Sequence, residues 1–314
     1  MRAGRFRLIL RTISKAIACC MLWAAVTVAA AADFTFAALG DTPYTAEEET
    51  GFIAMMAELN REPLAFVVHV GDFKNGHSAC SDEVFLQRKQ WFELSRHPFV
   101  FVPGDNDWTD CWRNAAGGYR PLERLRKLRE LFFAEAASLG QRRLALARQT
   151  EAKRAHPYRE HARWVHGGIL FATLNVPGGD NNFTRDRAEF RARDAAVRDW
   201  IRQSFRLARE QQLAGVVLLM QANPWAAAGA RRHGYVPLLK TLVGETTDFP
   251  GEVVLIHGDT HRFRVDRPLL HPDTRRPLAN FIRIEVFGSP SVNWVRVRVR
   301  ENAGNVKFEV TPGS

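Results

Sequence analysis

Several motifs that define common enzyme classes are absent from this sequence. It has no Gly-x-Ser-x-Gly elbow, which disfavours serine hydrolases of the α/β-hydrolase type. It has no phosphate-cradling P-loop, which disfavours the nucleotide hydrolases built around that loop. It also lacks an internal repeat, a low-complexity linker and a clear break in composition. We therefore expect one large domain rather than an array of small ones.

Cysteine is scarce as well, with four in 314 residues. Two of them are Cys19 and Cys20 near the N-terminus, which leaves Cys80 and Cys111 for the rest of the chain. No Cys-x-x-Cys spacing and no neighbouring basic partner point to a cysteine ligand or nucleophile. An even pair in an oxidising compartment favours a disulfide, here joining two loops, and two unpaired buried thiols are the alternative.

The first 32 residues have the three parts of a cleaved secretory signal: a basic start, an apolar middle over 17–28, and small residues over 29–32. The apolar part is too short to favour a permanent membrane anchor. We therefore expect a periplasmic or secreted protein. The segment carries five basic and no acidic residues, so its removal lowers the formal net charge from +10 to +5. A mildly basic chain suits an anionic substrate and does not predict specific nucleic-acid binding.

The chain repeats one pattern four times: an apolar run followed by Gly-Asp. The runs over 34–39, 64–70, 98–102 and 253–256 precede Asp41, Asp72, Asp105 and Asp259. In open α/β sheets, ligands bind beyond the carboxyl ends of the strands. Four carboxylates gathered at one such edge would repel each other strongly without a cation. The pattern therefore predicts a metal centre with oxygen ligands.

Helical and strand patterns alternate along most of the chain, which predicts an α/β fold. Helices are expected over 46–60, 82–96, 121–147 and 185–212, a strand or hairpin over 164–175, and a strand over 216–220. The C-terminal part reads as strands over 281–287, 294–300 and 307–310. We expect a single domain over 33–314 with a basic helical insertion around 121–160, whose arginines form a solvated face.

The order of the Asp41 loop, Gly71-Asp72…Asn75, Gly104-Asp105-Asn106-Asp107, Gln221…Pro224 and Gly258-Asp259-Thr260-His261 resembles the calcineurin-like metallophosphoesterase superfamily. The resemblance covers about residues 33–261. It implies two β-sheets packed face to face as a sandwich flanked by helices, in four layers. It also implies a metal site at the carboxyl ends of the strands, where two metal ions share one Asp and a water or hydroxide that attacks the phosphoester.

The resemblance also implies which residues hold the two ions. Asp41 and His261 would bind the first ion, helped by Asn75, and Asp72 would bridge both ions. The ligands left for the second ion are Asp105, Gln221 and Asp259. Carboxylate and amide oxygens favour Mn²⁺, Mg²⁺ or Fe over Zn²⁺.

Two departures from the family pattern bear on activity. Pro43 replaces a customary His ligand, and Asn106 replaces the His that normally helps the leaving group depart. General acid help is worth roughly 10²- to 10⁴-fold, and an amide cannot supply the proton. We therefore expect slow turnover, or a preference for diesters and activated monoesters. The variant motifs together look like one branch of the superfamily.

The remaining candidates lie in the loops. Asn106 and Asp107 are candidate catalytic residues, and Asn181, Asn182 and His233 are candidate substrate ligands, with Arg231 and Arg232 as possible phosphate partners. His69 and His257 are expected to lie beneath the metal site. The sequence thus predicts an exported two-metal hydrolase of phosphate mono- or diesters, acting on a phosphorylated small molecule or another anion, and leaves the oligomeric state open. A metal-binding or scaffold protein on the same fold and a metal-free structural domain are the alternatives.

Overall fold

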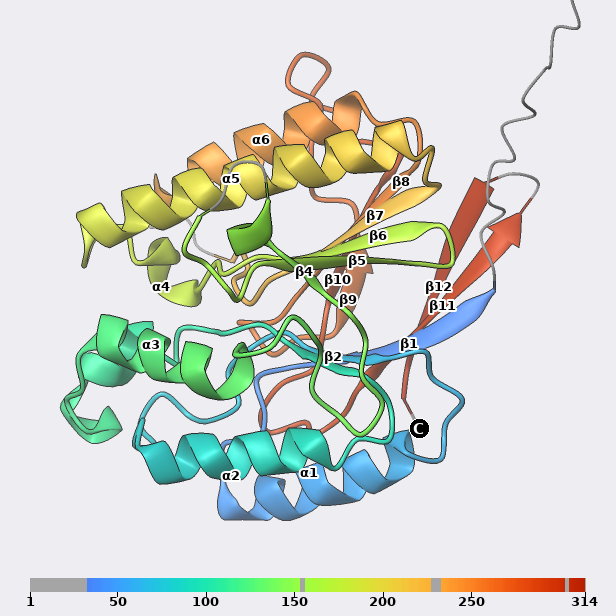
Figure 1. Cartoon of the computed structure of the whole chain (residues 1–314). Coiled ribbons are helices and arrows are strands. Elements are labelled where there is room, and N and C mark those ends of the chain that lie inside the picture. Colours follow the sequence, from blue (N-terminus) through green and yellow to red (C-terminus); the bar gives the residue numbers. More distant parts are fainter. Residues whose placement is uncertain (1–32, 153–155, 227–232, 303–304, 314) are drawn as a thin grey trace, which may run out of the picture.

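Two β-sheets pack face to face in the computed structural model, which describes residues 33–152, 156–226, 233–302 and 305–313 (Figure 1). The expected signal segment, Arg231 and Arg232 lie outside these residues. The first sheet has the strand order β12-β11-β1-β2-β3. Its strands are β1 (Phe34–Leu39), β2 (Val67–His69), β3 (Phe99–Phe101), β11 (Val295–Asn302) and β12 (Asn305–Pro312). Strands β1, β2 and β3 are parallel, and β11 pairs antiparallel with β1.

The second sheet has the order β4-β5-β6-β7-β8-β10-β9. It consists of β4 (Ala147–Arg148), β5 (Ala162–His166), β6 (Ile169–Thr173), β7 (Gly215–Leu219), β8 (Glu252–His257), β9 (Arg264–Asp266) and β10 (Phe281–Glu285). The expected hairpin is present as β5 and β6, and β6, β7, β8 and β10 run parallel. The carboxyl ends of these strands and those of the first sheet therefore meet at one edge of the sandwich.

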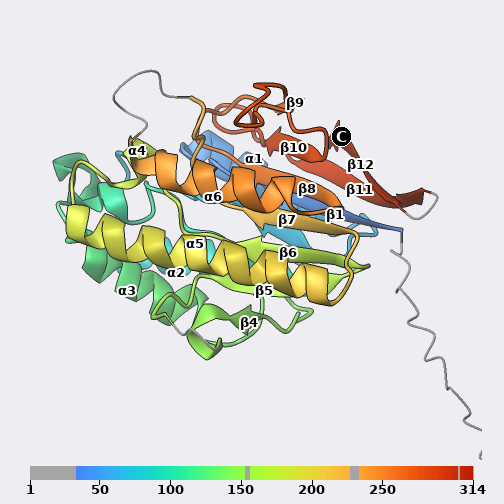
Figure 2. The same ribbon diagram turned by 90° about the horizontal axis from the view of Figure 1, so that it is seen from above.

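Helices cover the outer face of each sheet, which gives four layers (Figures 1 and 2). The first sheet is covered by α1 (Ala46–Leu59) and α2 (Asp82–Glu93), with α3 (Pro121–Phe132) beside them. Helices α5 (Arg187–Glu210) and α6 (Val236–Thr247) cover the second sheet. Thr45, Ser81 and Asp186 cap α1, α2 and α5 by accepting backbone N–H groups of their first turns.

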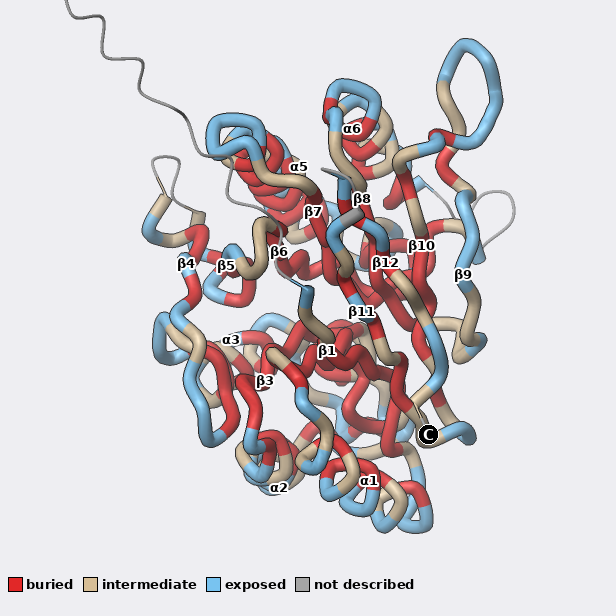
Figure 3. Tube along the Cα trace, turned by 90° about the vertical axis from the view of Figure 1, so that its right-hand side faces the viewer, coloured by how far each residue is buried: buried red, intermediate tan, exposed pale blue. Residues whose placement is uncertain are grey.

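The strands supply the core because their side chains alternate between two apolar layers. In β1, Phe36 and Ala38 face the second sheet, whereas Ala37 and Leu39 face the helices. Figure 3 shows the resulting buried centre, with exposed residues in loops, on outer helix faces and on the edge strands β9 and β12. In β11 the three valines Val295, Val297 and Val299 are fully buried. The arginines between them are partly exposed, as expected for a strand near a sheet edge.

The predicted helix over 121–147 is wrong beyond Phe132. Phe132 and Phe133 are consecutive and both buried in the core under the first sheet, where Phe133 stacks on Phe101. Phe133 ends the helix with the non-helical backbone angles φ −126° and ψ 22°. Residues after it run along the edge strand, with Leu139 bridged to Phe99. The 3₁₀ segment η3 (Gln149–Glu151) follows β4.

Other features concern the loops. Helix α6 was not predicted, and the loop over 177–182 contains the short helix α4 (Gly178–Asn181). The 3₁₀ turns η1 (Thr109–Trp112) and η2 (Asn114–Ala116) follow the Asp105 loop. Cys80 and Cys111 form a disulfide, which links the chain preceding α2 to η1. No helix among the described residues is both long enough and apolar enough to cross a membrane.

Candidate metal centre

The Gly-Asp turns converge at the edge where the parallel strands of both sheets end. Asp41, Asp72 and Asp105 follow β1, β2 and β3 in the first sheet, while Gln221 and Asp259 follow β7 and β8 in the second. The proximity predicted from the four apolar runs is therefore present. The backbone at Asp41, Asp72, Asp259 and His261 has positive φ, between 50° and 81°. Such angles cost energy in residues with a β-carbon and are common at functional sites.

Two glycines let the carboxylates approach the neighbouring backbone. A β-carbon at Gly104 would lie 2.1 Å from Asp72 Oδ1, and one at Gly258 would lie 1.9 Å from Asp41 Oδ2. Both distances are far below van der Waals contact, so only glycine fits at these two positions. The Gly-Asp pattern thus reflects the packing of each turn against a carboxylate from another strand.

Asp41 and His261 form one side of the cluster. Asp41 Oδ2 accepts a hydrogen bond from the backbone N–H of Asp259 at 2.9 Å. Asp41 Oδ1 is buried without a hydrogen-bond partner among the described residues and lies 3.7 Å from His261 Nε2. His261 Nδ1 lies 2.8 Å from the carbonyl oxygen of Ser289 and donates to it. This hydrogen bond leaves the Nε2 lone pair of a neutral imidazole directed at the carboxylates, as a metal ligand requires.

Asp72 lies on the other side of the carboxylate cluster. Its Oδ1 accepts from the backbone N–H of Asn106 at 3.0 Å, and its Oδ2 accepts from Gln221 Nε2 at 3.2 Å. Asp105 and Asp259 complete the cluster, because Asp105 Oδ2 and Asp259 Oδ1 both lie within 3 Å of the point that a β-carbon of Gly178 would occupy. The two sheets therefore contribute carboxylates to the same small volume.

The crowding of the carboxylates affects their electrostatics. Burial raises the pKa of Asp41 and of Asp72 well above the usual value, and neighbouring carboxylates raise it further, foremost Asp259 for Asp41 and Asp105 for Asp72. Burial, followed by the charge of Asp105, raises the pKa of Asp259 to about 7. Protons or cations must therefore neutralise the cluster near neutral pH.

The donor set fits divalent cations. It offers carboxylate oxygens, among them the unpartnered Asp41 Oδ1, and one imidazole nitrogen. The amide oxygen of Gln221 accepts from the backbone N–H of Gly178 at 2.6 Å. Among the described residues, no three His, Cys, Asp or Glu side chains already enclose a single ion position. Instead, Gln221 Nε2 donates to Asp72 Oδ2, and the backbone N–H of Asp259 donates to Asp41 Oδ2.

Comparisons with known proteins also indicate a metal-dependent phosphoesterase. A family model described as calcineurin-like phosphoesterase matches residues 34–263. The chain belongs to the calcineurin-like phosphoesterase family. As a member of this family it is a metallophosphoesterase, a hydrolase of phosphoric esters. A comparison with curated proteins finds no match.

Several solved structures have a fold similar to that of this phosphoesterase. A dimetal phosphatase from Danio rerio has 12% sequence identity and a TM-score of 0.55, with 89% of this chain and 98% of that chain covered. The structure of PhoD has 12% identity and a TM-score of 0.56, with 91% and 69% covered. A purple acid phosphatase from yellow lupin has 11% identity and a TM-score of 0.52, with 90% and 52% covered.

The phosphoesterase loops place several predicted site residues in supporting roles. Asp107 is fully buried, and its two carboxylate oxygens accept the backbone N–H groups of Asp72, Phe73 and Gly104 at 2.7–3.1 Å. It therefore fixes the loops after β2 and β3 to each other, and it is not directed at a substrate. Asn75 Oδ1 accepts the backbone N–H of His77 at 2.8 Å, so the described contacts turn this side chain toward its own loop.

The three candidate substrate ligands lie in and near α4. Asn181 is buried, where its amide donates to the carbonyl oxygen of Gly234 and its Oδ1 accepts from Arg193. Asn182 is buried too and donates to Glu189 Oε2. His233 is exposed beside the ring of Phe183. These contacts make Asn181 and Asn182 part of the loop framework, and their direct binding to a substrate stays a prediction.

The histidines before two of the Gly-Asp turns lie beneath the site, as expected. His69 is fully buried, lies 3.2 Å from the carbonyl oxygen of Thr42 and accepts from the backbone N–H of Gly71. Burial lowers the pKa of His69 to about 4 and that of His257 to about 3, so both are neutral at pH 7. Neutral imidazoles can hold these turns without adding charge to the cluster.

Sequence reasoning missed Tyr44, which is central to the site. Its hydroxyl donates to Asp72 Oδ2 at 3.2 Å, lies 3.4 Å from His261 Nε2, and accepts from the amide nitrogen of Asn106 at 3.1 Å. Burial, followed by the charge of Asp72, raises the pKa of Tyr44 well above 10, so the phenol keeps its proton. Its place three residues after Asp41 was the available signal.

Glu285 was also missed. This fully buried carboxylate at the end of β10 accepts from the Thr260 hydroxyl and from the Asn223 side chain, and it pairs with Arg264 at 2.8 Å. The backbone N–H of Asn223 in turn donates to Asp259 Oδ2 at 2.8 Å. Glu285 therefore supports the loop that carries Asp259 and His261.

Proposed function

We propose that the chain is an exported phosphoesterase that holds two divalent ions and hydrolyses phosphate mono- or diesters of small anionic molecules. The observation that carries this proposal is the convergence of four carboxylates from two sheets at one edge. Asp41, Asp72 and Asp105 follow strands of the first sheet, and Asp259 follows a strand of the second. Among the residues that the structure describes, no buried Lys or Arg pairs with Asp41 or Asp259, and both carboxyls have raised pKa values.

The predicted ligands have a place in this arrangement except Asn75, whose side chain turns toward its own loop. Asp41 and His261 would hold the first ion, Asp105, Gln221 and Asp259 would hold the second, and Asp72 would lie between them. Two divalent ions, when bound, lower the pKa of water and neutralise charge on the phosphate oxygens. The predominance of carboxylate and amide oxygens supports Mn²⁺, Fe or Mg²⁺ over Zn²⁺.

Asn106 and Tyr44 are the groups of this chain that would orient the phosphate. The Asn106 amide donates a hydrogen bond to the Tyr44 hydroxyl, and the Tyr44 hydroxyl donates one to Asp72. Both donors can turn to a phosphate oxygen when the carboxylates are neutralised by cations. Since Asn106 cannot deliver a proton, we expect ester preference to follow the leaving group, with diesters and activated monoesters ahead of alkyl monoesters.

Export is supported by two separate features. The basic, apolar and small-residue parts of residues 1–32 are typical of a secretory signal. The Cys80–Cys111 disulfide is stable in oxidising compartments and rare in a reducing cytosol. Detection of the mature N-terminus near residue 33 in a periplasmic or culture-medium fraction would test this part directly.

The enzymatic part is tested with bis-4-nitrophenyl phosphate and 4-nitrophenyl phosphate in the presence of Mn²⁺. We compare the wild type with Asp72→Asn and with the matched control Asp273→Asn, whose carboxylate is exposed in a loop after β9. Turnover that depends on metal, is lost in Asp72→Asn and is retained in Asp273→Asn supports the proposal. Bound metal without turnover of either ester would favour the alternative, a metal-binding protein that lost activity when Asn106 replaced the catalytic His.

A further inference from the structure

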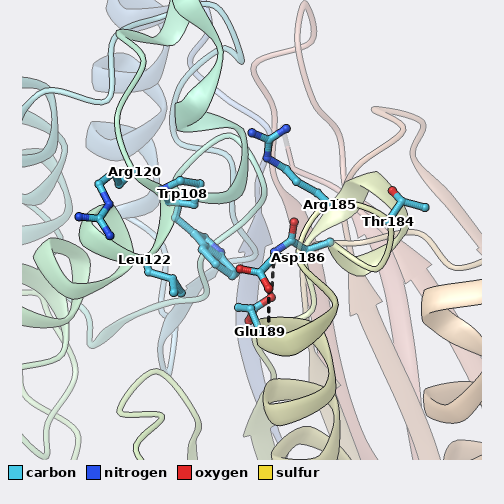
Figure 4. Close-up of a pocket in the computed structure, with 9 residues that line it drawn as sticks. Trp108, Arg120, Leu122, Thr184, Arg185, Asp186 and Glu189 are labelled. Carbon is cyan, nitrogen blue, oxygen red and sulfur yellow. Dashed lines mark hydrogen bonds between the residues drawn. The ribbon is translucent and has the colours of Figure 1, made fainter.

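A groove of about 650 Å³ lies beside the metal edge, between the start of α3 and the chain that leads into α5. Figure 4 shows Arg120 and Leu122 on one side of it, Arg185, Asp186 and Glu189 on the other, and the Trp108 ring between them. Trp108 follows the Asp105 loop directly, so the groove begins where the candidate metal ligands end. Its buried indole N–H has no hydrogen-bond partner among the described residues.

The acidic groups of the groove are already engaged. Asp186 caps α5 by accepting the backbone N–H groups of Ala188 and Glu189 at about 3 Å. Glu189 pairs with the fully buried Arg193 at 2.6 Å. In the described part of the chain, by contrast, Arg120 and Arg185 have no carboxylate within ion-pair distance, and both are exposed. The groove therefore presents uncompensated positive charge.

Arg185 has a fixed place in the groove. Its guanidinium lies 3.4 Å above the ring centre of Trp112, which is 41% exposed although it is a large apolar side chain. Stacking on an aromatic face holds a guanidinium while leaving its N–H edge available for planar anions. Trp112 belongs to η1, which the Cys80–Cys111 disulfide anchors.

Arg113 connects this arrangement to the metal edge. It pairs with Asp110 at 2.5 Å, and the charge of Asp110 also acts on Arg185. The guanidinium of Arg113 and the Asn106 amide oxygen both lie within 3 Å of the point that a β-carbon of Gly76 would occupy. The Arg113 guanidinium thus lies beside Asn106 at the metal edge, and Arg113 and Arg185 share the neighbouring carboxylate Asp110.

We propose that Arg113 and Arg185 bind a second anionic group of the substrate, so the preferred substrates are organic phosphates that carry another phosphate or carboxylate. This inference rests on the proposed function, since it assumes that the scissile phosphate lies at the carboxylate cluster. Asn106 separates the two subsites, and the exposed apolar surfaces of Trp112 and Leu122 face the organic part that joins the two anions. The arginines are specificity residues in this scheme and take no part in bond cleavage.

The test is the binding of glucose 6-phosphate and glucose 1,6-bisphosphate to the Mn²⁺-loaded protein, measured by isothermal titration calorimetry. The two probes share one organic group and differ by one phosphate. We expect the bisphosphate to bind at least about tenfold more tightly to the wild type, because one charge-assisted hydrogen bond to phosphate is worth about that factor. Arg113→Gln and Arg185→Gln should each reduce this ratio about tenfold and leave glucose 6-phosphate binding nearly unchanged.

Arg298→Gln is the matched control, because Arg298 lies on β11 away from the metal edge and its carboxylate partner Asp33 is 3.9 Å distant. The proposal is overturned if the ratio of the two binding affinities is unchanged in both groove variants. It is also overturned if the ratio falls equally in Arg298→Gln, because that would indicate a general effect of charge. Arg185 is exposed, so its substitution should not impair folding. Phosphate release is measured separately from the titration, so a failure of the proposed hydrolysis and a failure of this subsite give different results.

Discussion

Replacement of Asp107 by alanine tests whether this residue serves structure or catalysis. The change leaves three buried N–H groups, those of Asp72, Phe73 and Gly104, without an acceptor. Each such group costs about 1–3 kcal/mol. Part of the loss is recovered because the variant no longer buries a carboxylate, whose desolvation raises the pKa of Asp107 to about 6. We therefore expect the free energy of unfolding to fall by about 3–5 kcal/mol.

Urea unfolding of the metal-free protein, followed by circular dichroism with the disulfide intact, measures this loss. Asn106→Ala is the matched control. Within the described residues its side chain donates only to the partly buried Tyr44 hydroxyl, so its removal should cost about 1 kcal/mol. Suppose instead that Asp107→Ala unfolds at the wild-type urea concentration and yet has lost turnover. The loop-holding role would then be refuted, and Asp107 would belong among the catalytic groups.

Three further predictions concern stability. Replacing both Cys80 and Cys111 by serine should lower the free energy of unfolding by about 3–4 kcal/mol, because the disulfide closes a loop with a sequence separation of 31. Urea unfolding with and without reductant measures this loss. Equal midpoints for the variant and the oxidised wild type would contradict the prediction. The raised pKa of Asp259, about 7, means that the native metal-free protein binds this proton more tightly than the unfolded chain does. That contribution to stability is complete below about pH 4 and is lost as pH rises through 7, by up to about 4 kcal/mol. Urea midpoints from pH 4 to 8 should show this slope flattened in Asp259→Asn, and an unchanged slope would contradict the assignment. Arg129→Met should lower the free energy of unfolding by about 3–5 kcal/mol, because it leaves the fully buried Glu160 without its cation. Adding Glu160→Gln should recover most of this loss in the same assay. No recovery would show that the arginine acts through packing alone.

The strands and their Gly-Asp turns could be predicted from the sequence because each rests on a local signal. An apolar run marks a buried strand, and Gly-Asp marks its end, so the meeting of Asp41, Asp72, Asp105 and Asp259 follows from strand direction alone. The end of α3 could not be predicted in this way. Its apolar stripe continues past residue 132, and the helix stops because Phe133 finds a place against Phe101, which is distant in sequence.

Side-chain direction in the loops also lay beyond the sequence. The composition of 177–182 is that of a polar loop, and it cannot tell whether an amide faces a substrate or the protein. Arg193, on α5, turns the Asn181 side chain toward the protein by donating a hydrogen bond to its amide oxygen. Tyr44 is a similar case, because its hydroxyl meets Asp72, His261 and Asn106 from three separate loops.

The strand order of the first sheet has a consequence for the time course of folding. β1 is the first strand in the described chain, yet it lies between β2 and β11, where Phe34 pairs with Val299. During synthesis the ribosome must therefore release nearly the whole chain before β1 gains its second neighbour. Contacts between such distant segments form slowly. Asp41 at the end of β1 consequently reaches its final position late, and cation binding at this edge would report the completion of folding.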